Sequence, residues 1–205
     1  MKRLIPIIAL LAAFYSFAGA QDIRAVTEGG RSVLLHNDGT WSYVEAPQAS
    51  ISPARTFKVP DTAIGKVSSR KVSMSVFYDP NLWVVEKLTD EIAEFRFQLG
   101  DSEVYAYLMA EAGTFGLSAV RSGIIANAKK AAESFEVTEE GSAIVNGVQV
   151  QTLKARASMQ GIDVTFYLYY WSGPKGRVQL CGYASSADFD ANFKAILDLM
   201  NGLTL

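Results

Sequence analysis

The residue types that most often carry out catalysis are few in this chain of 205 residues. His36 is the only histidine and Cys181 the only cysteine, so a Ser-His-Asp or Cys-His arrangement, and most transition-metal sites, would need one of them. His36 lies beside a predicted hairpin turn, where an exposed polar residue is the ordinary expectation. Cys181 lies in an apolar strand pattern, which predicts a buried thiol. We therefore expect neither residue to be catalytic or to bind a metal.

Paired carboxylates are the second source of chemistry, because converging acids can transfer protons or bind calcium. Asp90 with Glu91 and Glu139 with Glu140 are neighbours in sequence, and neighbours in a strand point to opposite faces. No Gly-rich phosphate loop and no Gly-x-Ser-x-Gly elbow occurs in the sequence. The sequence thus predicts no catalytic residue, no metal ligand and no cofactor-binding residue.

Aromatic side chains are the remaining candidates for binding, since Trp and Tyr often anchor interfaces. The period of two along a strand puts Trp41 and Tyr43 on one face of a short strand, and Tyr169 and Trp171 on one face of a longer strand. These four residues are the predicted partner or ligand surface, and Trp171 is the strongest candidate because it ends its strand beside a Gly-Pro turn. The alternative is that they fill the core.

The first twenty residues have the pattern of a secretory signal peptide. A basic start at Lys2 and Arg3 leads into an apolar run over 4–17, and small residues fill 18–20. The apolar run of about 14 residues is shorter than the roughly 20 that a transmembrane helix needs. We expect cleavage between Ala20 and Gln21, a periplasmic or secreted protein, and no stable membrane insertion afterwards.

The charge of the remaining chain bears on its partners. Removing Lys2 and Arg3 from the 19 basic residues leaves 17, against 21 acidic residues. This mildly acidic balance disfavours nucleic acid, which rewards a basic face. The expected partner is therefore another envelope protein or a small ligand.

Three segments follow the leader. Residues 21–45 predict a small β unit with strands at 24–27, 32–35 and 40–44 and turns at 28–31 and 37–39. Residues 46–62 contain three prolines and are typical of a linker. Residues 63–205 form the main domain, and whether the β unit docks on it stays open.

The β unit resembles a short motif of exported bacterial proteins, Gly-Arg-x-Val-x-Leu-x-x-Asp-Gly-Thr-Trp-x-Tyr. The matching residues are Gly30, Arg31, Val33, Leu35, Asp38, Gly39, Thr40, Trp41 and Tyr43. The motif describes a structural unit to which no chemistry is assigned.

The main domain alternates strands and helices. Apolar patterns predict strands at 71–77, 82–85, 94–99 and 104–109. A helix follows, whose apolar stripe comprises Leu117, Val120, Ile124, Ala128, Ala131 and Phe135. Four more strands form a meander with hairpin turns at Asn146-Gly147, at Gln160-Gly161 and at 172–176. A last helix begins near Ser185 and ends at Gly202. This order predicts an α+β fold, with an antiparallel sheet whose two faces are both covered.

The order and its details resemble the PsbP-like superfamily over residues 66–205. The matching features are Tyr78-Asp79-Pro80-Asn81-Leu82-Trp83, Val145-Asn146-Gly147, Tyr169-Tyr170-Trp171, the Gly176 turn and the closing helix from Phe189. The resemblance implies an α/β/α sandwich on a central antiparallel sheet and an accessory, assembly or binding role.

Three functions follow as hypotheses. The first is an exported, non-catalytic binding or assembly protein. The second is a small-ligand carrier with an aromatic pocket between sheet and helix. The third is a hydrolase that uses carboxylates on the open face of the sheet, which would require two acids to converge in a cleft.

Overall fold

The computed structural model describes residues 23–26, 32–35, 40–43, 55–89, 93–174 and 176–205. The chain divides into a small unit that contains residues 23–43 and a main domain that contains residues 55–205. The predicted signal peptide, His36 and both turns of the small unit lie outside the described residues.

The small unit is a three-stranded antiparallel meander, as predicted. Strands β1 (Ile23–Val26), β2 (Ser32–Leu35) and β3 (Trp41–Tyr43) pair in the order β1-β2-β3. Leu35 lies opposite Trp41. In this short sheet the side chain of Val33 is buried, whereas the side chain of Trp41 is exposed to solvent.

An eight-stranded sheet forms the centre of the main domain. Its order is β4-β10-β11-β12-β13-β9-β8-β7, and every neighbouring pair is antiparallel except β4 with β10. The strands are β4 (Arg55–Phe57), β7 (Trp83–Lys87), β8 (Phe95–Leu99), β9 (Tyr105–Ala112), β10 (Ser134–Val145), β11 (Val148–Met159), β12 (Ile162–Gly173) and β13 (Gly176–Ser185). The predicted central antiparallel sheet is confirmed.

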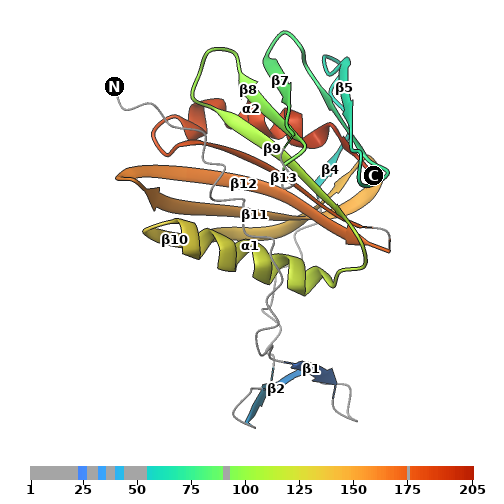
Figure 1. Ribbon diagram of the computed structural model, residues 1–205, viewed down its shortest axis with the longest axis vertical. Coiled ribbons are helices and arrows are strands. Elements are labelled where there is room, and N and C mark those ends of the chain that lie inside the picture. The colour runs from blue at the N-terminus through green and yellow to red at the C-terminus, as the bar shows by residue number, and fades with distance from the viewer. Residues whose placement is uncertain (1–22, 27–31, 36–39, 44–54, 90–92, 175) are drawn as a thin grey trace. The chain divides into compact units, whose positions relative to one another are not determined.

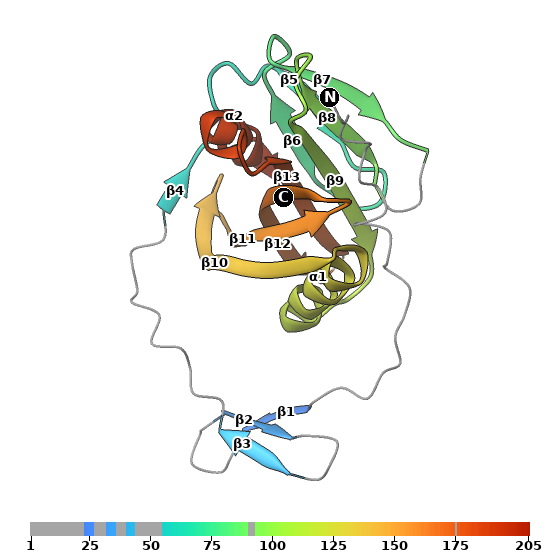
Figure 2. The same ribbon diagram turned by 90° about the vertical axis from the view of Figure 1, so that its left-hand side faces the viewer.

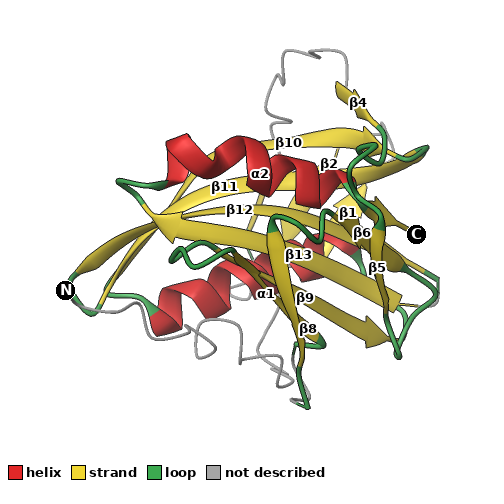
Figure 3. Ribbon diagram, turned by 90° about the horizontal axis from the view of Figure 1, so that it is seen from above, coloured by secondary structure: helices red, strands yellow, loops and turns green. Residues whose placement is uncertain are grey.

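Helices α1 (Leu117–Ala131) and α2 (Phe189–Asn201) cover opposite faces of this sheet (Figures 1 and 3). The α2 layer also includes a second sheet, in the order β14-β6-β5. Its strands are β5 (Gly65–Ser68), β6 (Ser75–Tyr78) and β14 (Leu203–Thr204). The domain is therefore richer in sheet than the α/β/α sandwich that the sequence predicts.

Each face of the large sheet has its own core. Beneath α2, buried residues of the helix meet Tyr169, Leu180 and Val145. Beneath α1, Val120 and Ala128 of the helix meet Phe166, Leu168 and Tyr183. Alternate residues of β12 thus enter different cores, which confirms that both faces of this strand are covered.

A β-bulge allows one strand to serve both cores. The pairing of β10 with β11 shifts register between Val137 and Glu139. Before the bulge, Phe135 and Val137 pack in the α1 core. After it, Ala143 and Val145 pack in the α2 core. The extra residue reverses which side chains face which helix.

The hairpin turns form as predicted. Asn146 and Gly147 have φ values of 50° and 86°, and Gln160 and Gly161 have 52° and 72°. Two successive residues with positive φ match the right-handed twist of the flanking strands. At the start of α2, Ser185 Oγ donates to Asp188 Oδ2 at 2.6 Å and accepts from the Asp188 N–H at 3.2 Å.

Three expectations about the elements need correction. The predicted linker 46–62 extends too far, because β4 pairs with Ala143–Val145 of β10 (Figure 2) and Phe57 packs against the α2 core. Six strands rather than four precede α1 in the main domain, since β4 and β5 carry too few apolar residues to predict. Phe135 belongs to β10 and not to the first helix, although it packs in the same core as that helix.

Candidate functional site

The structure separates the four predicted surface aromatics. Tyr169 is fully buried, and its hydroxyl donates to Asn201 Oδ1 at 3.0 Å. Its neighbours Ile196, Leu199 and Met200 of α2 are buried as well. Tyr169 therefore belongs to the core and does not form a surface, because α2 lies directly over this part of β12. The prediction of a binding surface at Tyr169 is wrong.

Trp171 is half-buried against the α2 core, and its ring lies over Gly173 of the same hairpin. A Cβ at Gly173 would lie 2.2 Å from the indole, so a larger residue at this position would displace the ring. Trp41 is 55% exposed. The side chain of Tyr43 lies outside the described residues.

Three loops meet at the Trp171 end of the sheet. Ser172 Oγ donates to the Phe115 carbonyl at 2.7 Å, and Thr114 Oγ1 donates to the Pro174 carbonyl at 3.2 Å. A Cβ at Gly176 would lie 2.3 Å from Val72 Cγ1, so the β5–β6 loop touches the backbone of the β12–β13 hairpin. The loops before α1, between β5 and β6, and between β12 and β13 therefore support one another.

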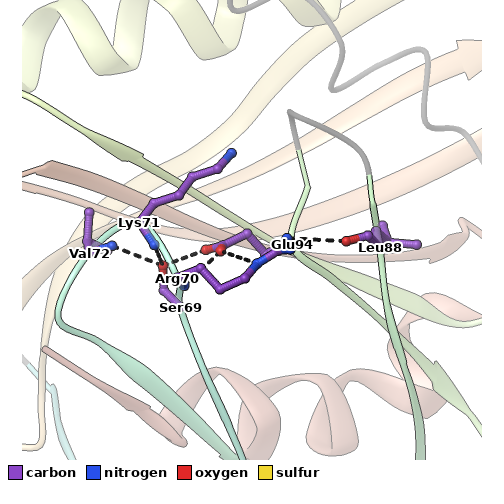
Figure 4. Close-up of polar contacts among 6 residues, drawn as sticks. All are labelled: Ser69, Arg70, Lys71, Val72, Leu88 and Glu94. Atoms are coloured by element: carbon purple, nitrogen blue, oxygen red, sulfur yellow. Dashed lines mark hydrogen bonds and ion pairs between the residues drawn. The ribbon is translucent and has the colours of Figure 1, made fainter.

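A buried carboxylate fixes the β5–β6 loop (Figure 4). Glu94 is 0% exposed. Its Oε1 accepts from the Arg70 backbone N–H at 2.8 Å and from Arg70 Nε at 3.3 Å, and its Oε2 accepts from Ser69 Oγ at 2.5 Å. The same Ser69 oxygen accepts from the N–H groups of Lys71 at 3.0 Å and Val72 at 3.1 Å. We call this group of residues the Glu94 anchor.

The Glu94 anchor also holds the end of β7. The Leu88 N–H donates to the Glu94 carbonyl at 2.9 Å, and Arg70 Nη2 donates to the Leu88 carbonyl at 3.2 Å. Both carboxylate oxygens of Glu94 have donors, as a buried charge requires. This side chain is thus placed to hold structure together rather than to accept a proton from a substrate.

A second polar group joins the other edge of the sheet. Asn146 Nδ2 donates to the carbonyls of Asn201 at 2.9 Å and Leu203 at 2.7 Å, and Asn146 Oδ1 accepts from the Val59 N–H at 2.8 Å. The Asn146 backbone N–H donates to the Phe57 carbonyl at 3.0 Å. One turn residue thereby ties together the segment after β4, the β10–β11 hairpin and the end of α2. We call this group the Asn146 anchor.

Cys181 and the neighbouring carboxylates Glu139 and Glu140 do not converge on a shared site. Cys181 is buried, as predicted, and burial raises the pKa of its thiol to about 12. Burial also raises the pKa of Tyr169. Glu140 forms a bidentate ion pair with Arg121, at 2.7 and 2.8 Å. Glu139, the preceding residue of β10, points to the opposite face of the sheet and pairs in register with Lys154 of β11. Asp90 and Glu91 lie outside the described residues, and the part of the chain that is described holds no cluster of three or more metal-ligating residues.

Three exposed apolar side chains lie at positions that the sequence did not reveal as exposed. Val84 and Leu82 are 64% and 44% exposed, at the edge strand β7 and just before it, and Ile64 before β5 is 76% exposed. The sequence pattern of 82–85 is apolar throughout, so it predicted a strand but gave no indication that one side would be open. Within the described ranges, no helix has the length and apolar character needed to cross a membrane.

Comparison with known proteins gives a fold but no sequence relative. No protein-family model matches the chain, and no curated protein matches it. The solution structure of cyanobacterial PsbP (CyanoP) from Synechocystis sp. PCC 6803 aligns over 72% of this chain and 95% of its own, with a TM-score of 0.52 and 10% identity. The main domain has a PsbP-like fold. At this identity the alignment concerns the fold alone.

Two other solved structures align less well. LpqN, involved in cell envelope biogenesis of Mycobacterium tuberculosis, aligns at 13% identity over 68% of this chain and 90% of its own, with a TM-score of 0.45. PA94 from Pseudomonas aeruginosa, a protein of unknown function, aligns at 12% identity over 69% and 96%, with a TM-score of 0.44. Both scores lie below 0.5, so these two structures carry no weight for the function of this chain.

Proposed function

We propose that this chain is an exported, non-catalytic binding or assembly protein of the periplasm or the extracellular space. In this proposal the small N-terminal unit presents Trp41, with Tyr43, to another envelope protein. The observation that carries the proposal is the 55% exposure of Trp41, in contrast to the burial of Trp83 in the main domain.

The physical argument rests on the size of the unit. Three strands of three or four residues cannot enclose a large indole ring. An exposed tryptophan costs hydrophobic free energy that a partner would recover, and buried tryptophans are among the strongest contributors to protein interfaces. The PsbP-like main domain then acts as the carrier of this binding unit.

Site-specific photo-crosslinking tests the proposal. The photoreactive amino acid p-benzoylphenylalanine replaces Trp41 in the full chain, expressed in its host, and Asp101 in an exposed turn of the main domain serves as the control position. We expect a discrete crosslinked product in the envelope fraction from position 41 and none from position 101. Equal yields at the two positions, or none at either, would contradict a partner at Trp41.

Export is tested separately. The mass of the protein recovered from the periplasm or medium should correspond to a chain that begins at Gln21. A chain that retains Met1 and stays in the cytoplasm would contradict both the signal cleavage at Ala20 and the proposed location.

A further inference from the structure

The sequence contains two Asn-Gly pairs, Asn146-Gly147 and Asn201-Gly202. In such a pair the side-chain amide can be lost without an enzyme, because glycine has no side chain to hinder attack by its own backbone nitrogen. That nitrogen gives up its proton and bonds to the side-chain amide carbon, and ammonia leaves. Water then opens the cyclic imide to aspartate, or to isoaspartate, in which the main chain runs through the side chain. The structure places the two pairs in different surroundings.

The Asn201-Gly202 pair is shielded. Both residues are buried at the end of α2, and Asn201 Oδ1 accepts from the Tyr169 hydroxyl at 3.0 Å. The attacking nitrogen would be that of Gly202, whose N–H donates to the Leu199 carbonyl at 3.1 Å. The nucleophile is therefore engaged, and little water reaches either residue. We expect Asn201 to keep its amide while the chain is folded.

The Asn146-Gly147 pair lies in the turn between β10 and β11, where Gly147 is exposed and Asn146 is half-buried. The hydrogen bonds of the Asn146 anchor are what restrain the reaction here. Nδ2 is the nitrogen that must leave, and it donates to the carbonyls of Asn201 and Leu203. Oδ1 of the same amide accepts from the Val59 N–H. The amide is therefore free to react only when these bonds break.

The bonds of the Asn146 anchor depend in part on a weakly held segment. Strand β4 has three residues, of which Arg55 and Thr56 are exposed and Phe57 is half-buried. It pairs only with the last three residues of β10. Segments with few buried contacts open more often than the core of a domain. Opening of β4 carries away Val59 and loosens the Asn146 amide, whereas it leaves the surroundings of Asn201 in α2 in place.

We propose that Asn146 is a site of spontaneous deamidation and that the product breaks the Asn146 anchor. The new carboxylate is ionised at neutral pH, so it has no proton to donate to the carbonyls of Asn201 and Leu203, and it repels them. A side chain that turns away from these carbonyls also leaves the Val59 N–H. Isoaspartate in addition lengthens the main chain of a two-residue turn, which then no longer matches the pairing of the flanking strands.

Loss of the anchor changes how the small unit is attached to the main domain. In chain order, β4 is the first strand of the main domain after the small unit, and β5 is the next. With β4 loosened, the connection between the small unit and the first firmly held strand extends to β5. Because the lost ammonia is not replaced, the change is permanent. This inference uses residues of the main domain only, so it stands or falls independently of Trp41.

Peptide mass spectrometry of the full mature chain, kept in neutral buffer at physiological temperature, tests the proposal. We expect Asn146 to be converted while Asn201 keeps its amide, and both to be converted when urea unfolds the chain. Val59→Pro removes the N–H that donates to Asn146 Oδ1 and changes neither Asn-Gly pair. Loss of one neutral hydrogen bond should speed the conversion of Asn146 by about two- to tenfold. Equal conversion of Asn146 and Asn201 in the folded chain, or an unchanged rate in Val59→Pro, would overturn the modification site.

Hydrogen exchange at the Val59 N–H tests the effect of the product. Asn146→Asp supplies the carboxylate directly, and exchange should become faster by about tenfold or more, since at least two hydrogen bonds are lost. Gln160→Glu is the matched control, because it adds a charge at an exposed turn residue with a similar φ of 52°. Unchanged exchange in Asn146→Asp, or an equal increase in Gln160→Glu, would show that the product does not break the anchor. If Asn146→Asp does not fold, the wild-type chain enriched in the converted form gives the same measurement.

Discussion

The two edges of the large sheet are built in different ways. The β7 edge is a five-residue strand with Val84 exposed. At the other edge, the three-residue β4 pairs only with Ala143–Val145 of β10, so we call this side the β10 edge. The exposed residues of the twelve-residue β10 include Glu136, Glu139 and Glu140, and a bulge interrupts the strand. Charges and bulges limit the pairing of an edge with other chains, and so does a short edge strand. The two edges therefore limit pairing in different ways, β10 by its glutamates and its bulge, and β7 by its length and by the exposed Glu86 and Lys87.

The edges also differ in what fixes them. At β7 a buried ionic group, the Glu94 anchor, connects the β5–β6 loop to the strand end. At β10 a neutral amide, the Asn146 anchor, connects three segments. A hydrogen bond to a charged group contributes about 1.5–3 kcal/mol, more than a typical neutral hydrogen bond. The β7 edge should therefore depend more strongly on a single residue.

The largest effect is expected for Glu94→Ala. It removes the charged acceptor of Ser69 Oγ and of the Arg70 backbone N–H, and two hydrogen bonds to a charged group contribute about 3–5 kcal/mol to the unfolding free energy. Urea unfolding measures this loss. The control is Glu86→Ala, which removes a half-exposed ion pair with Arg96 and should cost less than about 1 kcal/mol. Similar losses in the two variants would show that the Glu94 anchor does not hold this edge.

An intermediate effect is expected for Asn146→Gly. Glycine keeps the positive φ of the turn, but the Val59 N–H and two carbonyls lose their partner, which should cost about 2 kcal/mol. Gln160→Gly is the matched control, because Gln160 has nearly the same φ of 52° in the next hairpin and is exposed. Thermal unfolding of both variants measures the difference. If Gln160→Gly lowers the stability as much as Asn146→Gly does, the hydrogen bonds of the Asn146 side chain are not what stabilises the β10 edge.

The smallest effect on the unfolding free energy is expected for Glu140→Gln in β10. This substitution removes the charge that Arg121 pairs with between α1 and β10. Because the pair is partly exposed, the loss should be below about 1 kcal/mol and should shrink in high salt. Urea unfolding at low and high salt measures it, with the wild-type chain as reference. A loss as large as that of Glu94→Ala would remove the distinction between a surface charge and a buried one.

The sequence predicted most of the elements near the middle of the sheet and fewer at its edges. The hairpins at Asn146 and Gln160 were found because their turns need positive φ, and β12 was found because both of its faces are apolar. Strand β4 was mistaken for linker, because three residues with one apolar side chain give no periodicity. The start of β10 was assigned to the first helix, because Phe135 continues the apolar spacing of that helix.

The candidate site was less predictable than the fold. Tyr169 and Trp171 were correctly placed on one face, yet the sequence did not show that α2 covers Tyr169. The burial of Glu94 depends on a loop more than twenty residues earlier in the chain, and no local pattern reveals such a contact. Exposure of Val84 likewise depends on the position of β7 at the end of the sheet, which strand order determines and residue type does not.

The bulge in β10 has a consequence for how the domain unfolds. Phe135 and Val137 contribute to one core, and Ala143 and Val145, a few residues later on the same strand, contribute to the other. Loss of the whole strand from the sheet withdraws side chains from both cores at once. We therefore expect the two cores to unfold in one transition, without an intermediate that keeps one core and loses the other.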